Sequence, residues 1–190
     1  MKPILFNTEM VRAILKWKKT TTRRIIKVNN VLDVIGTSSS KCNDTFDMVL
    51  FGKLNKEKIG NSNVKERIKA PYLPGDILYV RETWCKGSLD YQDEKYYYKA
   101  DNNNFLCKWH PSIHMPKEAA RIFLKVTDVR VERLQDMKAE DFWSEGIETG
   151  DFDFKNLWNS TINKKDLCNY GWGANPYVWV IQFEIMEVKS

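Results

Sequence analysis

Apolar residues recur at helical spacing in an early segment and in two later ones. Thr8 is a suitable N-cap, and the apolar residues behind it predict a helix over residues 8–16. The same spacing predicts a helix over 138–145, with Gly146 at the position after its end, where glycine is favoured. A further short helix is expected over 153–162.

β-branched and aromatic residues form the strand-like segments. The segment 121–133 alternates until its phase slips at Asp128, which indicates a bulge or bend. The last segment is apolar almost throughout, so it is expected to be a central strand. The predicted strands cover residues 23–28, 77–84, 94–99, 121–133 and 177–184.

Residues 29–70 differ from the rest of the chain, because Asn, Ser, Lys and Gly dominate them. They are interpreted as a polar insertion with one strand near 46–51. Several short strands with helices between them predict an α+β fold, built on a small bent sheet or β-barrel. We expect a single domain over residues 1–190.

The composition and net charge of the chain indicate which kinds of molecule it can bind. The chain has 190 residues, of which 43% are hydrophobic and 29% charged, as in ordinary globular proteins. A net charge of +5 suits an RNA or nucleotide partner, and 13% aromatic residues suit either base stacking or a core. No apolar run reaches a membrane span and no signal peptide is evident, so we expect no membrane partner and a cytoplasmic location.

The four cysteines are widely spaced and are expected to be free thiols in a reducing compartment. Cys107, His110 and His114 raise the alternative of a zinc site. Two prolines interrupt that segment and no fourth ligand is near, so no metal and no cofactor are predicted.

A basic loop follows the first predicted helix. Residues 18–24 hold four cations and three threonines. Such a loop can bind phosphate, or it can activate a hydroxyl, because an amine among other cations loses its proton more readily. A solvated basic turn is the third interpretation.

This loop resembles the G-x-K-x-x-T-x-R signature of the ASCH domain, a relative of the PUA-like RNA-binding barrels. Lys19, Thr22 and Arg24 match the K, T and R positions, and Trp17 stands at the Gly position. Other matching segments follow in the family's order and include the longer form similar to ASCH proteins of bacteriophages and prophages. These segments are residues 74–82, 81–84, 111–116, 134–147, 175–179 and 178–183.

The resemblance implies a PUA-like fold and a site. The family includes a small amidohydrolase that removes the acetyl group of N4-acetylcytidine with a Lys, a Thr and a Glu. By position these are Lys19, Thr22 and Glu145. Other members are thought to bind or cleave RNA, so a non-catalytic RNA- or nucleotide-binding module and a ribonuclease remain open.

Each implied role has a chemical basis. Thr22 needs a base to act as a nucleophile, Lys19 between cations can supply it, and Glu145 near a helix C-terminus can hold a proton for a leaving amine. Arg24 shares the face of Thr22 and can hold a carbonyl or phosphate oxygen. In the alternative, Lys19 binds phosphate, Thr22 caps a loop, and Glu145 forms an ion pair with Arg24 or Arg81.

A second group of candidate substrate-binding residues comprises Arg81, Glu82, Trp84 and His114. On a strand Glu82 and Trp84 share a face, which can line a barrel mouth and bind a base. The alternative is a core Trp84 beside a satisfied ion pair, and a structural His114.

Overall fold

A curved five-stranded sheet is the main element of the fold. The structure is a computed structural model, and it describes residues 1–28, 32–39, 47–53, 64–87, 95–101, 107–147 and 150–188. The strand order of the sheet is β1-β6-β9-β10-β2. The bounds are Lys2–Leu5 for β1, Thr21–Ile25 for β2, Ile77–Arg81 for β6, Ile122–Arg133 for β9 and Tyr177–Val188 for β10. β1 runs parallel to β6, and the other pairs are antiparallel.

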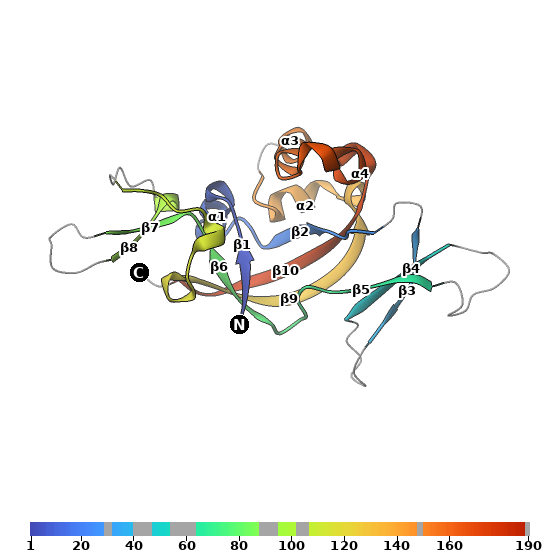
Figure 1. Cartoon of the computed structure of the whole chain (residues 1–190), viewed down its shortest axis with the longest axis horizontal. Helices are drawn as coiled ribbons and strands as arrows, with labels where there is room; N and C mark the ends of the chain where they lie inside the picture. Colours follow the sequence, from blue (N-terminus) through green and yellow to red (C-terminus); the bar gives the residue numbers. More distant parts are fainter. Residues whose placement is uncertain are drawn as a thin grey trace.

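The long pair β9 and β10 is the centre of the molecule (Figure 1). β10 is apolar on both faces because both are covered: Val178 and Val180 belong to one core cluster, and Ile181 to the other. The predicted central strand is therefore confirmed. The phase slip is also confirmed, because the register shifts where Gln182 pairs with Asp128 and Phe183 with Val126.

Helix α1 (Thr8–Leu15) begins at Asn7, whose side chain accepts from the backbone N–H of Met10. It ends in a Schellman motif, in which Trp17 N–H donates to Ile14 O and Lys18 N–H donates to Ala13 O. Trp17 has a φ of 59°, so it adopts a left-handed conformation that favours glycine.

Helix α2 (Ala139–Ser144) ends in the same motif, with Gly146 at a φ of 82° and hydrogen bonds from Gly146 N–H to Trp143 O and from Ile147 N–H to Phe142 O. Helices α3 (Asp151–Ser160) and α4 (Leu167–Tyr170) lie with α2 near β2 and β10 (Figure 1). Phe154 and Trp158 of α3 pack in the cluster of Val178 and Val180. The three predicted helices are confirmed, while β1 and α4 were not predicted.

Two smaller sheets lie at opposite ends of the molecule (Figure 1). β3 (Asp33–Ser38), β4 (Met48–Gly52) and β5 (Val64–Lys69) form one, and β7 (Trp84–Gly87) and β8 (Lys95–Tyr98) form the other. The insertion thus contains three strands where one was predicted. Short 3-10 turns complete the described chain: η2 (Lys99–Asp101), η3 (Ser112–His114), η4 (Lys117–Ala119), η5 (Leu134–Asp136), η6 (Lys164–Asp166) and η7 (Trp172–Ala174).

The fold is mixed α+β, and the described sheets do not close into a barrel. β1 and β2 are the two edges of the main sheet. They approach at the end of β1, where Leu5 O accepts a hydrogen bond from Arg24 of β2 and the ring of Phe6 contacts that of Phe183. β1 and β2 do not pair with each other as strands, and the candidate site lies where these two edges approach.

One expectation about the cysteines is wrong. Cys85 and Cys107 form a disulfide with a Cα–Cα distance of 6.5 Å. The spacing of 22 residues carries no pairing signal, and tertiary contacts bring the two together. Cys168 is a free, exposed thiol, and Cys42 lies outside the described residues.

Candidate functional site

A cavity of about 410 Å³ lies along the outer edge of β2. It lies within the size range of small-molecule sites. Four residues that the sequence singled out line it: Lys19, Thr22, Arg24 and Glu145. The remaining lining residues are Leu5, Phe6, Asn7, Thr8, Met10, Arg23, Thr83, Pro111, Ser112, Phe154, Leu157, Trp158 and Thr161.

The two Schellman loops bring Lys19 and Glu145 together. Lys19 and Glu145 form an isolated antiparallel bridge, and Thr20 N–H donates to Ser144 O at 2.8 Å. A Cβ on Gly146 would lie 2.7 Å from Ala13 Cβ, so the loops fit closely where glycine stands. The ends of α1 and α2 therefore set the position of both side chains.

The Lys19 side chain is 1% exposed. Its Nζ donates to Thr21 O at 2.8 Å, to Glu145 O at 2.9 Å and to Glu145 Oε2 at 2.5 Å. Burial lowers the pKa of Lys19, Glu145 opposes this, and Arg24 and Arg23 add to the lowering. The sequence anticipated the direction from neighbouring charges and from burial against Trp17, but burial by the fold dominates and Trp17 is 68% exposed.

The Glu145 carboxylate lies between two cations. Oε2 accepts from Lys19, and Oε1 accepts from Arg23 Nη1 at 3.2 Å. The alternative in which Glu145 forms an ion pair with Arg24 or Arg81 is wrong. Both carboxyl oxygens of Glu145 therefore lie within hydrogen-bond distance of a cationic side chain.

Arg23 connects this pair to a wider network. Its Nη2 lies 3.2 Å from Asp141 Oδ1 and 3.4 Å from Glu132 Oε2. Its Nε is buried without a hydrogen-bond partner among the described residues. Three carboxylates thus offset the charge of one buried arginine.

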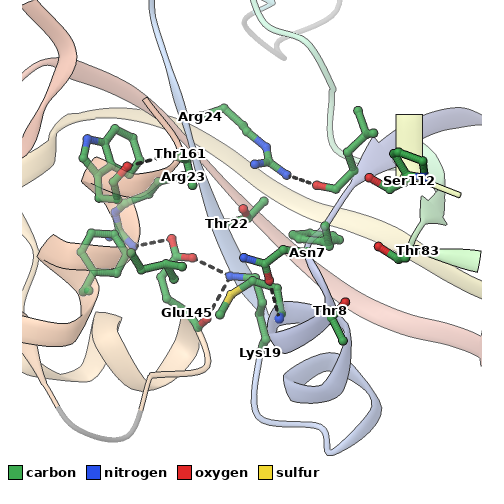
Figure 2. A pocket seen from close by; sticks show the side chains of 17 residues that line it. Asn7, Thr8, Lys19, Thr22, Arg23, Arg24, Thr83, Ser112, Glu145 and Thr161 are labelled. Atoms are coloured by element: carbon green, nitrogen blue, oxygen red, sulfur yellow. Dashed lines mark hydrogen bonds and ion pairs between the residues drawn. The ribbon is translucent and has the colours of Figure 1, made fainter. Parts of the chain in front are cut away.

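The Thr22 hydroxyl is available for a ligand. Thr22 is 3% exposed and lines the cavity, and no hydrogen bond holds its hydroxyl within the described part of the chain. Figure 2 shows it near the middle of the site, between Arg24 and Lys19. Because Lys19 Nζ donates to Thr21 O, the ammonium lies beside the peptide that precedes Thr22.

Arg24 shares the face of Thr22, as alternation along a strand requires. Its Nη2 donates to Leu5 O at 2.7 Å, and its guanidinium lies 5.3 Å from the ring centre of Phe6. Burial lowers its pKa, and the charge of Glu145 partly opposes this.

Sequence reasoning missed two walls of the cavity. Phe154, Leu157 and Trp158 form an apolar wall from α3. Their i, i+3, i+4 spacing was a visible signal of one helical face, but not of what it faces. Thr83 and Ser112 add hydroxyls from loops at distant positions, for which no local signal exists.

The second group of candidates lies outside this cavity. Arg81 Nε donates to Met115 O at 2.9 Å and its Nη2 to Ile113 O, so Arg81 ties β6 to η3. Trp84 packs against Tyr96 and His110. His114 is exposed in η3. The contacts of Arg81 and of the partly buried Trp84 support a structural role for these two residues, while the exposed His114 supports neither interpretation.

Glu82 is 1% exposed and forms an ion pair with Arg121, whose Nε lies 2.9 Å from Oε1 and whose Nη2 lies 3.2 Å from Oε2. Arg121 also contacts Asp101 at 2.8 Å. Burial raises the pKa of Glu82, while Arg121 opposes this. Glu82 therefore belongs to a second buried ion cluster, which does not line the cavity.

Two further findings concern the described residues. They contain no group of three or more His, Cys, Asp and Glu side chains that could hold a metal ion, and Cys107 of the zinc alternative is in the disulfide. No helix among them is long and apolar enough to cross a membrane.

The chain matches no family model, no curated protein and no solved structure.

Proposed function

We propose that this protein is an ASCH-like amidohydrolase that cleaves the amide of an N4-acylated cytidine or a similar nucleoside. In this proposal Thr22 is the nucleophile, Lys19 the base and Glu145 the acid. One observation carries it: a buried lysine with a lowered pKa, its carboxylate partner and an unbonded threonine hydroxyl line one cavity. The ASCH resemblance of the basic loop supports the substrate class.

The 2.5 Å contact between Lys19 Nζ and Glu145 Oε2 supplies both the base and the acid through one proton transfer. As an ammonium, Lys19 donates all three hydrogens to its three acceptors and has no lone pair for a base. Transfer of one proton to Glu145 leaves a neutral amine and a carboxylic acid. Burial favours the neutral amine of Lys19, because it lowers the pKa of that group.

The first half-reaction then forms an acyl-enzyme. Thr22 Oγ1 attacks the amide carbon and its proton moves to Lys19 Nζ. The new ammonium stabilises the negative charge on the amide oxygen. Glu145 gives its proton to the leaving nitrogen, the C–N bond breaks, and the Lys19–Glu145 ion pair is restored.

Water completes the cycle through the same proton transfer. The pair again becomes neutral, water attacks the ester carbon and gives a proton to Lys19. Glu145 returns a proton to Thr22 Oγ1 as the C–O bond breaks. The products are the free amine and a carboxylic acid, with the threonine and the ion pair as they began.

The test is deacetylation of N4-acetylcytidine, followed by chromatography, with the wild type, Thr22→Val and Thr22→Ser. Valine keeps the shape without the hydroxyl, so we expect kcat to fall by about 10³-fold or more. Serine keeps the hydroxyl and should retain activity within about tenfold. Equal rates for the valine variant and the wild type would refute the nucleophile.

A binding module without turnover is the second candidate, favoured by the three acceptors that hold Lys19 as an ammonium. It predicts that cytidine or short RNAs bind at the cavity with no acetate released and no strand cleaved. Salt-dependent binding of RNA without any product would refute the amidohydrolase and support the binding module.

A further inference from the structure

Two neighbouring arginines line the cavity with opposite surroundings. Arg23 faces three carboxylates at 3.2–3.4 Å. Arg24 has no carboxylate within ion-pair distance among the described residues, and its one hydrogen bond there goes to a neutral carbonyl. A guanidinium has five N–H donors, so most donors of Arg24 remain for a ligand. A half-buried cation without a counter-ion is costly, and an anionic ligand removes that cost.

Further donors lie at the same end of the cavity. Thr83 and Ser112 bring hydroxyls, and Asn7 and Thr8 bring the N-terminus of α1, a helix of eight residues. The first N–H groups of a helix lack backbone partners within it and favour anions; in α1 the Asn7 side chain caps that of Met10, and those of Thr8 and Glu9 precede it. The acidic residue of this turn, Glu9, pairs with Arg12 at 2.8 Å and does not line the cavity.

Figure 2 shows Arg24, Ser112 and Thr83 on the opposite side of Thr22 from Glu145, while Asn7 lies nearer the middle of the site. Arg24, Ser112, Thr83 and Thr8 follow one side of the site, and the Lys19–Glu145 pair lies on the other. A group bound among them is therefore not the amide under attack, but another part of the same substrate.

We propose that Arg24, Ser112, Thr83 and the N-terminus of α1 form a phosphate subsite, so that the substrate is a phosphorylated nucleoside. The nucleoside part rests on the proposed function, and the anion site does not. Donors from four segments suit a tetrahedral group with three acceptor oxygens better than a planar carboxylate with two. The phosphate belongs either to a free nucleotide or to an RNA strand, and these sources are separated below.

The first experiment titrates inorganic phosphate into the wild type, Arg24→Gln and Lys27→Gln at constant ionic strength. Binding is followed by calorimetry and by the melting temperature. Lys27 is exposed near the end of β2, so its variant loses one charge without touching the cavity. We expect saturable binding in the wild type and Lys27→Gln, and at least tenfold weaker binding in Arg24→Gln. Equal binding by all three, or none by the wild type, would overturn the subsite.

The second experiment compares cytidine, cytidine 5′-monophosphate and a short cytidine-containing RNA on the same variants. Binding of the monophosphate at least tenfold tighter than cytidine, lost in Arg24→Gln, assigns the subsite to a free nucleotide. Tight binding of the RNA with the monophosphate no better than cytidine assigns it to a strand. If neither phosphorylated ligand exceeds cytidine, the subsite is wrong.

The two proposals can fail separately. Thr22→Val should lose deacetylation and keep phosphate binding, because its hydroxyl is not part of the subsite. If phosphate binding depends on Arg24 and no deacetylation is observed, the amidohydrolase proposal is refuted and the subsite proposal is supported. If N4-acetylcytidine is deacetylated and phosphate does not bind, the subsite proposal is refuted and the amidohydrolase proposal is supported.

Discussion

Two buried ion clusters in this molecule look alike by burial and differ in what they can do. Glu145 is 4% exposed and Glu82 is 1% exposed, and each accepts from a cation. Glu145 has a lysine, which can lose its proton, besides the arginine Arg23, while the ion partner of Glu82 is an arginine, which remains charged. The first pair lines a cavity beside an unbonded threonine, and the second does not. Buried charge alone therefore does not indicate an active site.

The largest expected effect separates the two clusters by activity. Lys19→Met should lower kcat by about 10²–10⁴-fold, the usual contribution of a general base. Arg121→Met should leave kcat within about threefold at a temperature where both variants are folded, because Arg121 does not line the cavity. Steady-state deacetylation measures both. A loss of similar size in Arg121→Met would place Glu82 and Arg121 in the catalytic machinery after all.

Stability should show the reverse order. Arg121→Met leaves the Glu82 carboxylate buried without its cation, which should cost about 3–5 kcal/mol. Lys19→Met leaves Glu145 paired with Arg23 at 3.2 Å, so a smaller loss of about 1–2 kcal/mol is expected. Urea denaturation at pH 7 measures both. The double variant Arg121→Met with Glu82→Leu should recover most of the loss, and failure to recover would mean that Arg121 contributes mainly through packing.

The pH dependence of stability should differ in sign. Between its lowered folded pKa and 10.5, Lys19 holds more protons in the unfolded chain, so stability rises with pH. Between 4.5 and its raised folded pKa, Glu82 holds more protons in the folded chain, so stability falls as pH rises. Urea titrations across pH on the wild type, Lys19→Met and Glu82→Gln test this, and an unchanged slope in either variant contradicts its assignment.

The smallest effect concerns the loops that hold the cavity cluster. Trp17 adopts a left-handed backbone that strains a residue with a Cβ, so Trp17→Gly should stabilise the protein by about 1 kcal/mol. Gly146→Ala should cost more than about 1 kcal/mol, because its φ is positive and the new Cβ meets Ala13 at 2.7 Å. Thermal denaturation compares the two. A destabilised Trp17→Gly would show that the exposed indole contributes contacts of its own.

Much of the fold was visible in local patterns. The helix α1 followed from its apolar spacing, although its N-cap is Asn7 and not Thr8 as predicted, and the bulge in β9 followed from the phase slip at Asp128. The short strand β1 was missed, because four residues carry little periodicity and its pairing with β6 is non-local. The disulfide was missed for the same reason, since Cys85 and Cys107 meet through the loop that returns to Trp84.

Some residues of the candidate site were also predicted correctly from the sequence, and others were not. Lys19, Thr22 and Arg24 were found from their match to the ASCH signature and Glu145 from the same resemblance, and all four line the cavity. Of the second group, Arg81, Glu82 and Trp84 were expected on strand alternation to line a barrel mouth, and His114 was a separate candidate. The group lies elsewhere because β6 ends at Arg81 and the chain turns before β7 begins at Trp84. Alternation does not continue across such a break.

By itself, the sequence determined the helices and strands with strong periodicity, the basic loop, and the shared face of Thr22 and Arg24. The tertiary structure decided that Lys19 meets Glu145, 126 residues away, that Arg23 is offset by three carboxylates, and that Arg24 is not. The physical reason is that spacing along one strand sets only the face of a side chain. Its burial, its ion partners and therefore its proton affinity depend on segments that meet only in the folded chain.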